Sequence, residues 1–165
     1  MTKKIGYIGL GVLGSAMVPN LIESGFDVIG YDVRPEILDE LGKLGMQAAT
    51  SPKDAAERAD IIVTCLPSLE ILMEVYGGED GIDKADKAGQ IVIETSTFPV
   101  DEKEKAKAFM DAAGKRMLDC PVSGNRILAV GAFNLDVCAK QGHPTRHRQL
   151  RATQTGVAAI PQGGA

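Results

Sequence analysis

Six residues near the start of the chain have the spacing of an anion-binding turn. They are Gly9, Leu10, Gly11, Val12, Leu13 and Gly14, with glycine at the first, third and sixth positions. The turn follows an apolar stretch, residues 4–8, and opens a stretch of helical periodicity, residues 12–23. Such glycines permit a tight bend, a close approach of a pyrophosphate, and close packing of helix on strand. Free N–H groups at the helix start face the anion. We therefore predict that the six residues bind a dinucleotide.

A carboxylate lies where the ribose of such a dinucleotide would reach. Asp32 follows Gly11 by 21 residues, at the end of an apolar and aromatic stretch, residues 26–31. An acidic side chain at this distance typically bonds the ribose 2′-hydroxyl. It also repels a 2′-phosphate, which favours NAD over NADP. Arg34 could bind such a phosphate, so NADP stays possible; both side chains could instead be solvated surface charges.

Three later segments follow expected strands and carry proline or hydroxyl groups. They are Leu66-Pro67-Ser68, Thr95-Ser96-Thr97 and Cys120-Pro121-Val122-Ser123-Gly124. The carboxyl ends of strands in an open α/β sheet face the ligand crevice, so we expect these segments to lie together there. Their hydroxyls could bond cofactor or substrate. Alternatively, Ser68 caps the helix that follows it, and the threonine and serine hydroxyls cap the helix after Pro99.

The cysteines and histidines could form two further kinds of site, a nucleophile and a metal site. Cys120 could act as a nucleophile, but no histidine in the first 124 residues offers itself as a base, which favours a buried, inert thiol. His143 and His147 have a spacing that can bind metal in a helix. Pro144 lies between them and no third ligand accompanies them, so we predict no metal site.

Strand-like and helix-like stretches alternate along the first 120 residues. The nearly uninterrupted apolar run over residues 61–66 is typical of a strand buried on both faces, as in a parallel sheet. The alternation predicts right-handed βαβ crossovers and an α/β fold, a doubly wound Rossmann-type mostly parallel sheet. Strands are expected over residues 4–8, 26–31, 61–66, 91–94 and 116–119, and helices over 12–23, 35–44, from 52, from 69 and over 100–113.

Length and composition narrow the class of protein. A chain of 165 residues with 44% hydrophobic and 24% charged residues can bury one globular core. No apolar run approaches the roughly 18 residues of a membrane span, and a net charge of −4 argues against a nucleic-acid partner. Three dispersed cysteines, and a first strand that leaves no room for a targeting segment, predict a cytoplasmic protein.

The pattern changes after Gly124. Residues 125–165 hold five basic residues and one acid, whereas residues 1–124 are strongly acidic, and the alternation of strands and helices stops. We therefore predict a nucleotide-binding domain over residues 1–124 and an atypical, poorly packed tail over residues 125–165. A frameshift, a truncation or a naturally divergent last segment would each explain this tail.

Residues 4–124 resemble the β-hydroxyacid dehydrogenase family, whose members include 3-hydroxyisobutyrate dehydrogenase-like enzymes. The resemblance implies that Leu66, Pro67 and Thr97 contact the cofactor, and that Ser123 and Gly124 hold the substrate carboxylate. It implies reversible hydride transfer between NAD(P) and a small 3-hydroxy or 2-hydroxy acid. The stretches that carry it are Gly-Leu-Gly-Val-Leu-Gly-Ser-Ala-Met-Val-Pro-Asn-Leu over 9–21, Tyr31-Asp32-Val33, Leu66-Pro67, Glu94-Thr95-Ser96-Thr97, and Asp119-Cys120-Pro121-Val122-Ser123-Gly124.

The chain departs from the family in its last segment. The family places a catalytic lysine, with an asparagine nearby, on a long helix that opens a second, all-helical domain. No Lys-x-x-Asn follows Gly124, and Lys140 is followed by Gln141-Gly142-His143-Pro144. We therefore expect the C-terminal helical domain to be absent and assign no catalytic residue. The alternatives are a non-catalytic NAD-binding or redox-sensing module, and a subunit that contributes only a nucleotide site.

Overall fold

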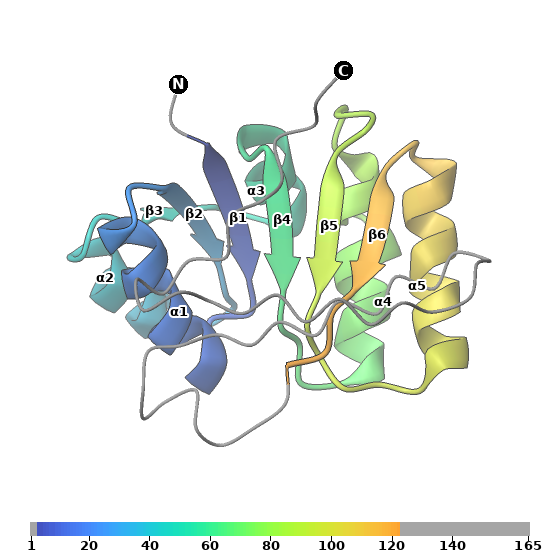
Figure 1. Ribbon diagram of the computed structural model, residues 1–165, viewed down its shortest axis with the longest axis horizontal. Helices are drawn as coiled ribbons and strands as arrows, with labels where there is room; N and C mark the ends of the chain where they lie inside the picture. Colours follow the sequence, from blue (N-terminus) through green and yellow to red (C-terminus); the bar gives the residue numbers. More distant parts are fainter. Residues whose placement is uncertain (1–2, 123–165) are drawn as a thin grey trace.

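The computed structural model describes residues 3–122 as one parallel sheet flanked by helices (Figure 1). No helix among these residues is long and apolar enough to cross a membrane. The strands are β1 (Lys4–Ile8), β2 (Asp27–Tyr31), β3 (Gln47–Ala48), β4 (Ile61–Thr64), β5 (Ile91–Glu94) and β6 (Arg116–Asp119). The helices are α1 (Val12–Glu23), α2 (Pro35–Gly42), α3 (Pro52–Arg58), α4 (Leu69–Gly77), the short 3₁₀ turn η1 (Ile82–Lys84) and α5 (Val100–Ala112).

The strand order is β3-β2-β1-β4-β5-β6, and every pair is parallel. Ile8, the last residue of β1, pairs with Tyr31 on one side and Thr64 on the other. From β1 the chain adds β2 and β3 on one side of the sheet. It then returns to the other side of β1 and adds β4, β5 and β6. Doubly wound sheets bind ligands beyond the carboxyl ends of the strands at such a reversal, here β1 and β4, and the strand order confirms the predicted doubly wound Rossmann-type sheet.

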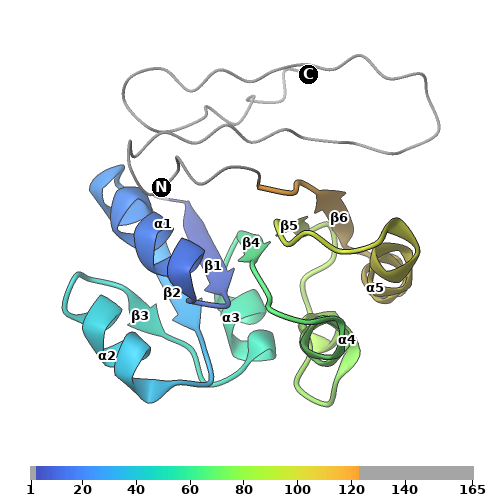
Figure 2. The same ribbon diagram turned by 90° about the horizontal axis from the view of Figure 1, so that it is seen from below.

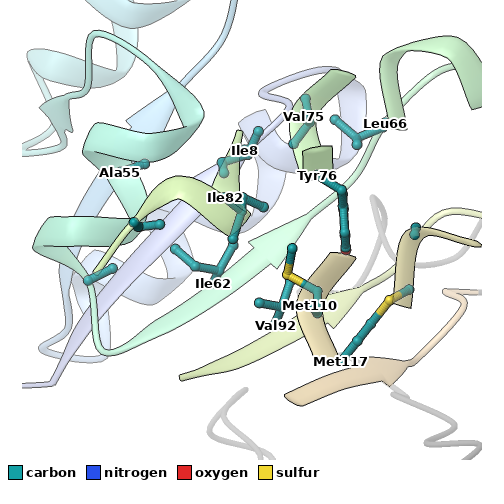
Figure 3. Packing of buried hydrophobic residues seen from close by; sticks show 14 of the residues in the cluster. Ile8, Ala55, Ile62, Leu66, Val75, Tyr76, Ile82, Val92, Met110 and Met117 are labelled. Carbon is teal, nitrogen blue, oxygen red and sulfur yellow. The ribbon is translucent and has the colours of Figure 1, made fainter. Parts of the chain in front are cut away.

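Each face of the sheet has its own hydrophobic core. Figure 2 shows α1 and α2 on one side of the strands and α3, α4 and α5 on the other. Within β1, Tyr7 faces the first group of helices and Ile8 the second, because neighbouring strand residues point to opposite faces. The larger core joins Ile8 and Ile62 of the sheet to Tyr76 of α4 and to other residues of the three helices (Figure 3). All four residues of β4 are buried, as the apolar run predicted.

Helix α2 ends earlier than predicted, and strand β3 was not predicted. Helix α2 ends at Gly42, not at Leu44, and Leu44 is 53% exposed instead of extending the apolar face. The N–H of Met46 turns back to the carbonyl oxygen of Leu41 at 3.2 Å, which closes the helix early. The sequence also gave no sign of β3, because a two-residue strand has no periodicity.

The ends of β2 and β4 also differ slightly from the prediction. The N–H of Phe26 bonds the carbonyl oxygen of Leu21 and closes α1, so β2 begins one residue later than expected. β4 ends at Thr64, and the N–H of Leu66 leaves the ladder to bond the hydroxyl of Ser96 at 2.8 Å. The predicted bounds of β1, α1, β5 and β6 are confirmed.

Neighbouring residues of α4 test how much the larger core stabilises the fold. Leu72 is fully buried, whereas Ile71 is 41% exposed. We expect Leu72→Ala to lower the free energy of unfolding by about 2–5 kcal/mol, because it leaves a cavity among close-packed side chains. Ile71→Ala should change it by less than about 0.5 kcal/mol. Urea unfolding followed by circular dichroism measures both, and equal losses would contradict this view of α4.

Candidate functional site

The glycine turn joins β1 to α1 at the carboxyl edge of the sheet. Gly9 has a φ of +91°, and a Cβ atom on it would lie 2.1 Å from the carbonyl oxygen of Cys65. A Cβ on Gly14 would lie 2.6 Å from the carbonyl oxygen of Gly9. These two glycines therefore serve the tight bend and the close packing of helix on strand that the sequence predicted.

Gly11 differs from the other two glycines of the turn. It lies just before α1, and no atom comes within 4 Å of the position that its Cβ would take. No side chain caps the start of this helix, so its first N–H groups keep their capacity to bond an anion. Val12 is 75% exposed beside them, whereas Leu10 is fully buried under the turn and Leu13 is half-buried. The open space at Gly11 fits a ligand pressed against the backbone.

Asp32 follows β2 and reaches across to the glycine turn. Its Oδ2 accepts a hydrogen bond from the N–H of Leu10 at 2.8 Å. Arg34 bonds both carboxylate oxygens, from Nε to Oδ1 at 2.8 Å and from Nη2 to Oδ2 at 3.0 Å. The Asp32 side chain is only 8% exposed, whereas that of Arg34 is 55% exposed. The structure thus brings the predicted carboxylate beside the turn and pairs it with the predicted arginine.

The charge of Asp32 is stabilised by these contacts. Burial by itself would raise the pKa of the carboxyl group. The hydrogen bonds from the Arg34 side chain and from the N–H groups of Arg34 and Leu10 outweigh burial and hold the pKa below its usual value. Asp32 is therefore ionised throughout the neutral pH range, so both of its side-chain oxygens act as hydrogen-bond acceptors.

The segment after β4 lies at the same edge of the sheet. Leu66 is buried, Pro67 is exposed, and Ser68 is the N-cap residue just before α4. The Ser68 hydroxyl accepts a hydrogen bond from the N–H of Ile71 at 3.3 Å, so the capping interpretation of this serine is confirmed. Pro67 is left as the exposed side chain of the segment.

The three hydroxyl residues after β5 do not share one role. Thr95 donates its hydroxyl hydrogen to the carbonyl oxygen of Thr64 at 2.7 Å, and the Ser96 hydroxyl bonds Leu66. Both side chains are buried, and the helix after Pro99 has no side-chain cap, so neither alternative predicted for these two hydroxyls is right. Thr97 is exposed just beyond the carboxyl end of β5 and keeps its hydroxyl for other partners.

The segment after β6 is described as far as Val122. Cys120 is fully buried, which fits the interpretation of an inert thiol. Ser123 and Gly124, the predicted carboxylate site, lie outside the described residues. So do His143, His147 and the tail over residues 125–165. In the part of the chain that the structure describes, no three histidine, cysteine or acidic side chains gather as metal ligands.

Sequence reasoning gave no role to Glu94, the last residue of β5. Its side chain is fully buried, and Oε2 accepts hydrogen bonds from the Thr64 hydroxyl at 2.5 Å and the Tyr76 hydroxyl at 3.3 Å. Burial and the neighbouring Glu94 carboxyl raise the pKa of Tyr76 well above its usual value. An acidic residue inside an apolar strand pattern was the available signal, because such a side chain needs buried partners.

Comparisons with known proteins show which family the chain is related to. A family described as the NAD binding domain of 6-phosphogluconate dehydrogenase matches residues 4–143. Mitochondrial 3-hydroxyisobutyrate dehydrogenase of Rattus norvegicus is 46% identical over 121 residues, covering 73% of this chain and 36% of the relative. NAD-dependent L-serine dehydrogenase of Pseudomonas aeruginosa is 34% identical over 122 residues, covering 74% and 41%. The solved Mycobacterium tuberculosis 3-hydroxyisobutyrate dehydrogenase with L-serine has a TM-score of 0.74 and 29% identity, over 83% of this chain and 46% of that one.

The chain spans 36% of the length of the rat relative and 41% of the bacterial one. The family match over residues 4–143 includes the glycine turn and Asp32, which carry part of the resemblance to β-hydroxyacid dehydrogenases. That resemblance is confirmed by these relatives. Since the family match extends over most of the sequence, the chain belongs to the family of the NAD binding domain of 6-phosphogluconate dehydrogenase.

Proposed function

We propose that this chain is the cofactor-binding part of an NAD-dependent dehydrogenase of the 3-hydroxyisobutyrate dehydrogenase type. The observation that carries the proposal is the open space at Gly11, beside an uncapped helix start and within reach of the Asp32 carboxylate. Backbone N–H groups suit a pyrophosphate, and a carboxylate suits a ribose diol. The relatives named for 3-hydroxyisobutyrate and L-serine make a small hydroxy acid the proposed substrate class.

Each part of the edge has a proposed role in binding. Residues 9–14 hold the pyrophosphate, and Asp32 accepts from the ribose hydroxyl. Leu66, Pro67 and Thr97 contact the other half of the dinucleotide, where Pro67 and Thr97 are exposed. Ser123 and Gly124, outside the described residues, would hold the substrate carboxylate. NAD supplies the hydride acceptor, and the chain's own residues bind and orient it.

The preference between NAD and NADP depends on Asp32 and Arg34. An ionised Asp32 repels a 2′-phosphate, and this favours NAD. Arg34 carries a positive charge on an exposed side chain only two residues away, and it could bind that phosphate if it left Asp32. NAD is therefore the proposed cofactor, with NADP as a weaker alternative.

A second candidate function is a non-catalytic NAD-binding or redox-sensing module. Hydride transfer to a carbonyl needs a proton donor at the developing alkoxide. Neither histidine of the chain lies within residues 3–122, and the buried Lys103 is bonded to the Ser96 carbonyl oxygen and to Asp119. A sensing module would need only the binding residues.

Titration of the full chain with NADH and NADPH, followed by nicotinamide fluorescence, tests the shared part of both candidates. Assays with 3-hydroxyisobutyrate, L-serine and glycerate then test the chemistry. Turnover supports an active dehydrogenase and would contradict the expectation that the chain holds no catalytic residue, whereas binding without turnover supports a chain that supplies only a cofactor site. The absence of binding would contradict both.

The compartment is also a proposal. The cysteine pattern supports a reducing compartment, and we propose the cytoplasm. Relatives from rat, mouse and human carry mitochondrial names, so the mitochondrion is the competing location. Imaging of the tagged full-length protein in its native cells decides between them.

Substitutions of the glycines in the turn should have separate effects on folding and on cofactor binding. Gly11→Ala should leave the melting temperature unchanged or slightly higher, because its backbone is ordinary and the space is empty. It should weaken NADH binding at least about tenfold, since the methyl group would occupy the ligand's place. Gly9→Ala should instead prevent folding, because its Cβ would meet the Cys65 backbone. Fluorescence titration and thermal unfolding measure the two effects.

Substitution of Asp32 tests its role at the ribose. Asp32→Ala should weaken NADH binding by about tenfold or more and NADPH binding less, because it removes both a hydroxyl acceptor and a charge that repels phosphate. Arg34→Ala is the matched control and should weaken NADPH more than NADH. Equal losses for the two cofactors in Asp32→Ala would count against the ribose role.

A further inference from the structure

Ser96 lies at the carboxyl end of β5, between the buried sheet and the exposed Thr97. It is only 7% exposed, so a ligand in the crevice would not rest on it. Its hydroxyl group, N–H and carbonyl oxygen are all hydrogen-bonded, each to a different part of the fold. We call Ser96 and its direct partners, Leu66, Glu94 and Lys103, the Ser96 network.

The hydroxyl of Ser96 fixes the segment after β4. It accepts a hydrogen bond from the N–H of Leu66 at 2.8 Å, in a buried setting and across 30 residues of sequence. Leu66 has left the sheet ladder at this point, so this contact replaces the bond that a longer strand would have made. The position of Leu66, and of Pro67 after it, therefore depends on one serine hydroxyl.

The N–H of Ser96 ties the segment to the core. It donates to Oε1 of Glu94 at 2.6 Å, and Oε2 of Glu94 accepts from Thr64 in β4 and Tyr76 in α4. Tyr76 is fully buried among the residues of the larger core. A carboxyl group held on both oxygens is a rigid anchor for the backbone of Ser96.

The carbonyl oxygen of Ser96 connects the segment after β5 to the end of β6. It accepts a hydrogen bond from Nζ of Lys103 at 2.5 Å, and the same Nζ bonds Oδ1 of Asp119 at 2.5 Å. The Lys103 side chain is 5% exposed. The N–H of Val122 also donates to the carbonyl oxygen of Thr95 at 3.1 Å, which holds the last described residues to the same place.

We infer that Ser96 is a positioning residue that sets the spacing of Pro67 and Thr97 for the nicotinamide half of the cofactor. This inference rests on the proposed function. Pro67 and Thr97 are the exposed side chains of their two segments, and Ser96 joins the segments beneath them. A site held rigid before binding loses less entropy when the ligand arrives.

The position of Ser96 in the sheet indicates which half of the cofactor it affects. A doubly wound sheet binds one mononucleotide on each side of the reversal between β1 and β4. Asp32, after β2, belongs to the side that binds the adenosine ribose. The Ser96 network joins the ends of β4, β5 and β6, on the other side, where nicotinamide lies. A substitution that breaks the Ser96 network should therefore weaken the binding of NADH but leave the binding of a ligand without nicotinamide unchanged.

Ser96→Ala in the full chain, with NADH and ADP-ribose as the two probes, tests this directly. The dissociation constant for NADH should rise about tenfold, and that for ADP-ribose should stay within about twofold, by isothermal titration calorimetry. Gln90→Ala is the matched control. Gln90 is buried at the opposite, amino end of β5, where its side chain donates to the carbonyl oxygens of Ala56 and Ala59, both at 2.8 Å. It should lower the melting temperature but leave both dissociation constants unchanged.

A second variant protects the test against a general loss of structure. Lys103→Met keeps a long side chain but removes the bonds to the Ser96 carbonyl oxygen and to Asp119, and it should weaken NADH binding selectively as well. Equal weakening of NADH and ADP-ribose in Ser96→Ala would overturn the inference, as would unchanged NADH binding or an equal NADH loss in Gln90→Ala. Wild-type chain that binds neither probe would overturn the proposed function itself, which is a different result.

Discussion

The site depends on one close contact between two backbones. The turn after β1 lies against the carbonyl group of Cys65, the residue that follows β4, and only glycine fits at position 9. The N–H of Gly9 also bonds the carbonyl oxygen of Tyr31 at the end of β2, at 3.0 Å. The turn is therefore held between the strands on either side of β1. This contact places the helix start, the Asp32 carboxylate and the segment after β4 at a single edge.

Much of the fold could be predicted because its elements have strong local signals. Helix α1 combines helical periodicity with a glycine, Gly25, that takes a φ of +84° just after it. β4 is buried on both faces, and Thr64 at its end is its one polar residue. The early end of α2 and the pairing of β3 were not predictable in the same way. The first depends on a backbone hydrogen bond between Met46 and Leu41, and the second on pairing with strand β2. Neither contact leaves a pattern in the local sequence.

The candidate site likewise has a part that local sequence predicts and a part that it does not. Motif spacing placed Gly9, Asp32 and the segments after β4 and β5 at one edge, since parallel strands end together. The use of each hydroxyl could not be read from the sequence. Thr95, Ser96 and Thr97 are adjacent and chemically alike, yet two bond inside the protein and the third is exposed. Their roles follow from partners about 30 residues away, Thr64 and Leu66, whose positions only the folded sheet defines.

The pairing of Asp32 with Arg34 limits how a cofactor can bind. A carboxylate offers about four acceptor positions. The Asp32 oxygens already accept from Nε and Nη2 of Arg34 and from the N–H groups of Arg34 and Leu10. In the proposed role of Asp32, a ribose hydroxyl would therefore replace a bond from the arginine side chain. That side chain is more than half exposed, so its displacement costs little. Under the same proposal the freed guanidinium could bond a 2′-phosphate, and discrimination between the cofactors would be a competition between Asp32 repulsion and Arg34 attraction.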